Sequence, residues 1–333
     1  GQAALKPVAK LLGAEGDTLE YCIVYARILL CSLTALMLQF LFQAFFIAAE
    51  KPKLGLIVTV SAGLANVVFD AIFIVGLKLD VAGAAAATAI GQIIGGIIPL
   101  IYFARKNSSL LRLTKARPRI KPIMQACFNG SSEFMTNISM SIVTMLFNLK
   151  LMQLAGDDGV AAYSAIMYIQ YIFVSIFLGY STGVSPVISY HYGAQNKVEL
   201  HGLLKRSLVI IAVFSAVMLT LSEALSSPLS KLFVGYDYDL YIMTRNGLRI
   251  AAAMFAVCGF NIFASAFFTA LNNGLISAAI SLTRTLVFQI ATVMTLPIFM
   301  GLNGVWASVS IAEALALIFT AVCFITKKKK YGY

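Results

Sequence analysis

The feature that most constrains this chain is a succession of long apolar runs separated by short polar segments. A helix of about 20 apolar residues crosses the ~30 Å hydrocarbon layer of a bilayer. Hydrophobic residues make up 60% of the chain and charged residues 12%, which excludes a soluble domain. The sequence therefore predicts an all-α, polytopic helical membrane protein. We count nine spans, at about 20–48, 53–77, 82–104, 123–154, 159–188, 203–225, 240–270, 276–299 and 303–326.

Basic residues are distributed unevenly between the two sides of the predicted bundle. The chain has 25 Lys and Arg against 14 Asp and Glu. Positive charge concentrates in short loops on the cytoplasmic side of membrane proteins, so the C-terminus is predicted to be cytoplasmic and the N-terminus outside. This pattern argues against nucleic acid as a partner. The residues on the basic side are Lys51, Lys53, the segment 105–121, Lys197, Lys205, Arg206 and the run Lys327–Lys330.

The basic segment RKNSSLLRLTKARPRIKP, residues 105–122, is the only long polar connection in the sequence, and we interpret it as a linker. An internal repeat supports that division. A shift of 222 residues aligns 44–46 with 266–268, both Ala-Phe-Phe, and a shift of 221 aligns Gly83 with Gly304. The first three spans thus repeat as the last three, in the same direction. We expect a partial N-lobe of three helices in 1–104, a complete C-lobe of six in 123–333, and a parent protein of twelve spans.

An aspartate lies inside the second apolar run. Asp70 is ~10 Å from the end of that run, and Asn66 precedes it by one turn on the same face. Thr88 lies at a similar depth on the following run, so a carboxylate, an amide oxygen and a hydroxyl converge in a set that suits a hard cation or a proton. Tyr25 reaches the same level from the first run. The alternative is a structural charge, with Asp70 neutralised by Arg27.

The second half of the chain carries its own charges at depth. Glu133, Arg284 and Glu313 all lie roughly mid-span. One structural Arg–Glu pair would account for Arg284 and one glutamate. The remaining carboxylate is predicted to exchange protons or to attract a cationic substrate into a cavity. Amides at comparable depth either line that cavity or join helices by hydrogen bonds, namely Asn137, Asn148, Gln170, Asn261 and Gln289.

No motif predicts an enzyme, a metal site or an organic cofactor. The cysteines occur without CxxC or Cys/His spacing. His191 and His201 fall in or near a loop, and no pair of acids has metal-ligand spacing. The five cysteines are Cys22, Cys31, Cys127, Cys258 and Cys323.

Residues 66–70, NVVFD, followed by 81–88, VAGAAAAT, and Gln92 resemble the multidrug and toxic compound extrusion family. Residues 12–14 (LGA), 129–134 (NGSSEF) and 193–196 (GAQN) are similar to motifs at matching places in bacterial members. The resemblance implies twelve helices in two lobes, with 1–104 equivalent to helices 4–6. It also implies alternating access and export of cationic, amphiphilic small molecules in exchange for Na⁺ or H⁺. A monomer in the bacterial plasma membrane is expected.

The family's N-lobe cation site uses an Asp on the first helix, Asn and Asp on the fifth, Thr on the sixth and Tyr on the fourth. Asn66, Asp70, Thr88 and Tyr25 match the last four, whereas the first-helix aspartate has no counterpart. Some members use an acid on the tenth helix, and the span 240–270 has none past Asp239. A lipid-linked oligosaccharide or polysaccharide flippase of the same architecture is the alternative. Such a flippase would need several arginines at depth to hold pyrophosphate.

Overall fold

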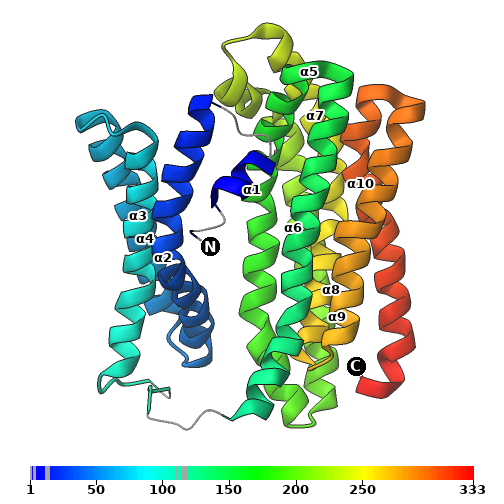
Figure 1. Cartoon of the computed structure of the whole chain (residues 1–333). Coiled ribbons are helices and arrows are strands. Elements are labelled where there is room, and N and C mark those ends of the chain that lie inside the picture. The colour runs from blue at the N-terminus through cyan, green and yellow to red at the C-terminus, as the bar shows by residue number, and fades with distance from the viewer. Residues whose placement is uncertain (1, 3–4, 12–15, 110, 115–118) are drawn as a thin grey trace. The chain divides into compact units, whose positions relative to one another are not determined.

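The computed structural model describes residues 2, 5–11, 16–109, 111–114 and 119–333. These residues form helices and connections, and no strand occurs among them. The all-α prediction is therefore confirmed. The chain divides into two units, residues 1–117 and 118–333, and the division falls inside the segment predicted to be a linker. Each unit is described by itself (Figure 1).

The first unit is a bundle of three long helices preceded by a short one. It contains α1 (Leu5–Leu11), α2 (Gly16–Ala48), α3 (Pro52–Asp70), the π-helix η2 (Ala71–Gly76) and α4 (Asp80–Ala104). Helix α4 packs against both α2 and α3. Its buried face consists mainly of Gly and Ala, which allow neighbouring helix backbones to approach closely inside a membrane. At one end of the unit, Phe42, Phe46 and Phe103 form a buried aromatic cluster.

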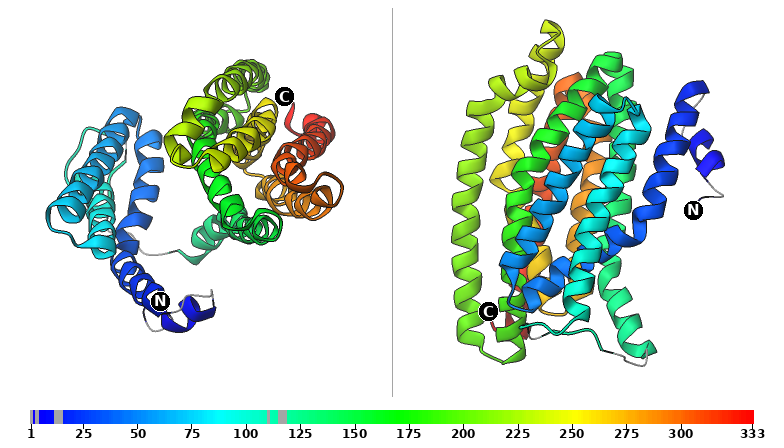
Figure 2. Two further views of the ribbon diagram at one scale, coloured as in Figure 1. Left: turned by 90° about the horizontal axis from the view of Figure 1, so that it is seen from above. Right: turned by 90° about the vertical axis from the view of Figure 1, so that its left-hand side faces the viewer.

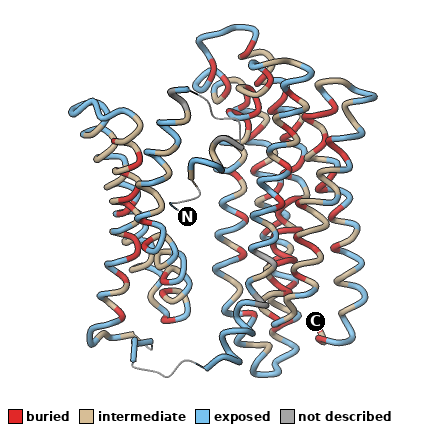
Figure 3. The backbone as a smooth tube through the Cα atoms, in the orientation of Figure 1, coloured by how far each residue is buried: buried red, intermediate tan, exposed pale blue. Residues whose placement is uncertain are grey.

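The second unit contains the remaining helices, which stand side by side in the end-on view of Figure 2. An apolar core lies between them and includes Phe147, Phe177, Phe255 and Phe263. Figure 3 colours the backbone by burial and shows buried stretches, in red, along several helices of this unit. Outward-facing apolar residues such as Phe299, 83% exposed, are typical of a surface in contact with lipid. The elements are α5 (Ile120–Gly193), α6 (Lys197–Val234), α7 (Tyr238–Ala252), η3 (Ala253–Ala256), α8 (Cys258–Ala270), α9 (Gly274–Leu282), η4 (Thr283–Phe288) and α10 (Gln289–Tyr331).

Helices α5 and α10 each reverse direction at a glycine (Figure 1). Gly156 has φ 61° and ψ −150°, and Gly301 has φ 55° and ψ −134°. Such backbone angles are open essentially to glycine alone, because a side chain would clash with the backbone. Each of these two long helices therefore consists of two antiparallel legs, as the predicted breaks at 154–159 and 299–303 require.

Among the described residues, six helices are long and apolar enough to cross a membrane, or seven if the bent pair Tyr238–Ala256 and Cys258–Ala270 counts as one more span. Two of the six contain the glycine reversals, so each holds two legs. The count of nine spans stays a prediction. Helix α6 is longer than the predicted 203–225 at both ends, because the more polar segments 197–202 and 226–234 are also helical. At the start of α6, the Asn196 side chain accepts a hydrogen bond from the Glu199 amide at 3.1 Å.

The turns that follow α2 and α8 share one backbone conformation. Glu50 and Asn272, which are 222 residues apart, have φ angles of 58° and 56°. The next residues, Lys51 and Asn273, donate their amides to the carbonyl oxygen five residues earlier, at 2.8 and 2.9 Å. This local agreement has the spacing of the predicted repeat. How the two sets of three helices relate in space stays a prediction.

Candidate cation and substrate sites

The first unit brings together two of the four predicted cation ligands. The Asn66 side-chain amide on α3 donates a hydrogen bond to the Thr88 hydroxyl on α4 at 3.4 Å. Both residues are half-buried. The amide oxygen of Asn66 and the remaining lone pair of the Thr88 hydroxyl can still accept a hydrogen bond or coordinate a cation. These two side chains therefore form the start of an oxygen-rich cluster between α3 and α4.

Asp70 follows Asn66 by one helical turn and is the last residue of α3 before the π-helix η2 begins at Ala71. Within the described residues the half-buried Asp70 carboxylate has no ion pair and no hydrogen bond, and the exposed Arg27 has no ion pair either. The predicted alternative of an Asp70–Arg27 pair is thus not formed. Single π-helical turns inside α-helices occur often at functional sites. The carboxylate is left available to a ligand.

Among the described residues, no hydrogen bond connects Tyr25 to this cluster. Its side chain on α2 is 37% exposed, and its role stays a prediction. The residue of α2 that does bond to α4 is Ser32, whose buried hydroxyl donates to the Gln92 side-chain oxygen at 2.7 Å. Ser32 lies two turns beyond Tyr25, and Gln92 one turn beyond Thr88. That spacing could have identified Ser32 from the sequence.

The second unit contains a buried network centred on Glu313 of α10. Arg284 of η4 donates from Nε to Glu313 Oε1 at 2.8 Å, and the two side chains are 19% and 2% exposed. Asn261 of α8 donates to Glu313 Oε2 at 2.8 Å and to its backbone carbonyl at 2.9 Å. Thr320 in turn donates to the Asn261 side-chain oxygen at 3.0 Å. The prediction that one glutamate pairs with Arg284 is confirmed.

Glu133 lies in the first leg of α5, but its side chain falls outside the described residues. Its predicted part in the substrate cavity or in a second protonation site stays a prediction.

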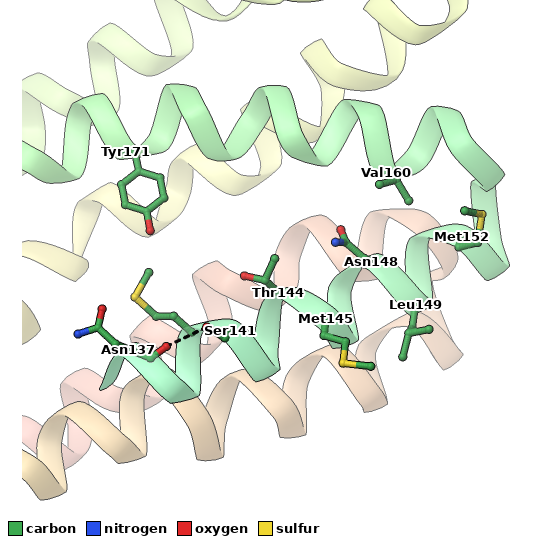
Figure 4. A pocket seen from close by; sticks show the side chains of 10 residues that line it. Asn137, Ser141, Thr144, Met145, Asn148, Leu149, Met152, Val160 and Tyr171 are labelled. Carbon is green, nitrogen blue, oxygen red and sulfur yellow. Dashed lines mark hydrogen bonds between the residues drawn. The ribbon is translucent and has the colours of Figure 1, made fainter. Parts of the chain in front are cut away.

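A cavity of about 700 Å³ opens between the two legs of α5 (Figure 4). Its wall combines three methionines with Leu and Val, and its polar groups are uncharged. The Asn148 side-chain oxygen there is buried without a partner in the structure, so it can accept a hydrogen bond from a ligand. The lining residues are Asn137, Met140, Ser141, Thr144, Met145, Asn148, Leu149, Met152, Val160 and Tyr171.

A smaller cavity of about 120 Å³ shares Met140, Thr144 and Tyr171 with the large one. Its wall includes the paired Arg284 and Glu313, whose opposite charges offset one another. Gln170 and Gln289 also line it, and the Gln170 side-chain nitrogen is buried without a partner. The predicted amides therefore divide between the two cavities and, for Asn261, the buried network.

Within the described part of the chain, no three His, Cys, Asp or Glu residues gather in a way that could hold a metal ion. Two carboxylates in the described helices thus differ: Asp70 in the first unit has no ion pair, whereas Glu313 in the second is paired with Arg284.

Comparison with known proteins places these features in a family. A family model described as MatE matches residues 2–72 and 134–295. Multidrug export protein MepA from Staphylococcus haemolyticus (strain JCSC1435) is 30% identical over 309 residues, which are 92% of this chain and 68% of that protein. An outward-facing multidrug resistance MATE family transporter superposes with a TM-score of 0.92 at 21% identity, covering 99% of this chain and 74% of the other. A MOP superfamily transporter from Pyrococcus furiosus superposes with a TM-score of 0.92 at 21% identity, covering 100% of this chain and 75% of the other.

Proposed function

This chain belongs to the MatE family of multidrug and toxic compound extrusion transporters, and from that premise we propose that it exports small amphiphilic molecules in exchange for Na⁺ or H⁺. The family consists of membrane transporters rather than enzymes. The proposal includes a location in the bacterial plasma membrane, a cytoplasmic C-terminus and a monomeric state.

The observation that carries the export function is the large cavity between the legs of α5. Its volume of about 700 Å³ lies within the range of about 300–1,000 Å³ typical of sites for drug-sized ligands. Met140, Met145 and Met152 give it a flexible, polarizable wall that can repack around different ligands. Neutral polar groups such as Thr144 and Asn148 add hydrogen bonds without selecting one charge. A cavity of this kind suits varied amphiphiles better than one fixed substrate.

The preference for cations is proposed from Glu133, which precedes Asn137 of the cavity wall by one helical turn in the sequence. A carboxylate at that position would attract cationic amphiphiles. A lipid-linked oligosaccharide flippase is less well supported, because no basic side chain among the described residues lines the large cavity. Arg284 is moreover already paired with Glu313.

The coupling site is proposed to be the cluster of Asn66, Asp70 and Thr88, with Tyr25 at its edge. Asp70 supplies the charge that a cation or proton neutralises, and the other oxygens complete its coordination or hydrogen bonding. Occupation of the site from one side and release to the other would link inward ion flow to outward export of substrate.

Ethidium efflux from proteoliposomes containing the full-length protein tests this function. Na⁺ and pH gradients are imposed separately, and at least one of them should drive ethidium export. Met145→Ala, in the cavity wall, should raise the KM for ethidium several-fold. Met135→Ala is the matched control, because Met135 is exposed on the same helix outside the cavity. An ethidium flux that neither gradient changes would contradict the proposal. Equal effects of the two methionine variants on the KM would contradict it too.

A further inference from the structure

A third cavity, of about 350 Å³, lies between α6 and α10 and is separate from the proposed substrate site. Its long walls are apolar and include Leu208 of α6, Phe260 of α8 and Leu317 of α10. Ile325, which also lines it, is 74% exposed, so the cavity opens onto the outer surface of the unit. In a membrane protein that surface faces the acyl chains of the bilayer. The cavity therefore has the walls of a chain-binding groove.

One end of this cavity is basic. His201 of α6 and Lys328 of α10 line it, both are exposed, and within the described residues neither forms an ion pair. Both helices change from charged to apolar at this level. Helix α6 begins with Lys197 and continues through Lys205, and α10 ends in the run Lys327–Lys330. This change marks the boundary between water and hydrocarbon, so the basic end lies where lipid headgroups lie.

The basic end is held in place by Tyr333, two residues beyond the end of α10. Tyr333 is 5% exposed and donates a hydrogen bond from its hydroxyl to the Phe324 carbonyl at 3.2 Å. Its ring also contacts Phe267 of α8 edge to face, with centroids 5.2 Å apart. Burial raises the pKa of the Tyr333 hydroxyl, which is neutral at physiological pH like that of an ordinary tyrosine. The cavity is thus preformed, and a ligand need not order the segment that closes it.

We propose that this cavity binds an acidic phospholipid of the bilayer, with an acyl chain between α6 and α10 and the headgroup phosphate at Lys328 and His201. An apolar groove that ends in the unpaired Lys328 ammonium, with the His201 imidazole beside it, complements a lipid that carries net negative charge. A zwitterionic lipid would also bring a positively charged headgroup amine toward Lys328, which repels it. Of the run Lys327–Lys330, Lys328 lines the cavity. Its neighbours in the run strengthen the attraction from outside the cavity.

Native mass spectrometry of the full-length protein tests the charge recognition. The protein is supplied with equal amounts of phosphatidylglycerol and phosphatidylcholine of identical acyl chains, and the retained lipids are counted. Phosphatidylglycerol should be retained preferentially. Lys328→Gln should weaken that retention about fivefold, the effect of roughly 1 kcal/mol per basic residue at a membrane surface. Lys329→Gln removes the same charge outside the cavity and should have a smaller effect. Equal retention of the two lipids, or equal losses in the two lysine variants, would overturn the proposal.

A second pair of variants tests the chain-binding part without changing charge. Ala321→Trp fills the cavity, whereas Val322→Trp places the same bulk on the exposed face next to it. The first should abolish preferential retention and the second should preserve it, with thermal unfolding used to confirm that both fold. Inorganic phosphate should not displace the lipid, because it lacks the chains. Displacement by phosphate, or equal behaviour of the two tryptophan variants, would show that no chain is bound here.

Discussion

The two units of this molecule each hold a carboxylate inside an apolar helical run, and the two carboxylates are treated differently. Glu313 is almost fully buried, and its two oxygens accept hydrogen bonds from Arg284 and Asn261. Asp70 is half-buried and has no ion pair within the described residues. A carboxylate whose two oxygens both accept hydrogen bonds from the protein helps to hold the helices together, whereas an unpartnered carboxylate can bind and release a ligand. Depth in the membrane therefore does not by itself assign a role to an acid.

The predicted repeat sharpens this difference. A shift of 221 residues aligns Gln92 with Glu313. The first unit thus has a neutral amide at the position where the second has its buried acid, and Gln92 accepts a hydrogen bond from Ser32 instead of from an arginine. The acid of the first unit lies on the preceding helix, at Asp70. The two units thereby differ in where charge lies, while their helical hairpins share the same turn.

The largest expected effect comes from breaking the ion pair of the second unit. Arg284→Met leaves the Glu313 carboxylate buried without its cation, and removing one partner of such a pair costs about 3–5 kcal/mol. The thermal unfolding midpoint in detergent should therefore fall sharply. The double variant Arg284→Met/Glu313→Leu removes both charges and should recover most of the loss. An unchanged midpoint in Arg284→Met would show that Glu313 does not depend on this pair.

A smaller effect separates Asn261, which donates a hydrogen bond to Glu313, from Asn66, which lies one helical turn before Asp70 and donates to Thr88. Asn261→Ala leaves Glu313 and Thr320 short of hydrogen bonds in the core, which should cost about 1–3 kcal/mol. Asn66→Ala removes one long hydrogen bond at a half-buried position and should cost less than about 1 kcal/mol. Gradient-driven efflux, normalised to the amount of folded protein, should fall more in Asn66→Ala than in Asn261→Ala. Similar losses of stability in the two variants would contradict the proposal that Asn261 has a structural role and Asn66 a functional one.

The smallest effect concerns the shared turn. Glu50 and Asn272 adopt left-handed backbone angles, which cost most non-glycine residues about 1–2 kcal/mol and asparagine less. Glu50→Gly should therefore stabilise the protein by up to about 1 kcal/mol, and Asn272→Gly by only a few tenths. Both side chains are exposed, so little contact is lost. Thermal unfolding of the two variants measures the difference, and destabilisation by Glu50→Gly would contradict equal geometry in the two turns.

Much of the fold could be predicted from the sequence because apolar length and turn residues determine it locally. The breaks at Gly156 and Gly301 fall between predicted spans, and the Asn66–Thr88 contact follows from helical spacing across one hairpin. Which acid would pair with Arg284 could not be chosen, since Glu133 and Glu313 have similar depths and the choice depends on how η4 packs against α5 and α10. The Ser32–Gln92 contact was missed because serine alone in an apolar helix carries little signal, and only its helical spacing relative to Tyr25, together with that of Gln92 relative to Thr88, could have indicated it.

The central claim is that Asp70 couples ion flow to export, and efflux by Asp70→Asn tests it most directly. Asparagine is nearly isosteric and neutral, so folding and equilibrium binding of ethidium should be preserved. Gradient-driven efflux from proteoliposomes should fall to the level of protein-free liposomes, because the site can no longer change charge. Asp80→Asn is the control, since Asp80 is exposed at the start of the next helix. Efflux at the wild-type rate in Asp70→Asn would contradict the account and leave Asp70 a structural residue.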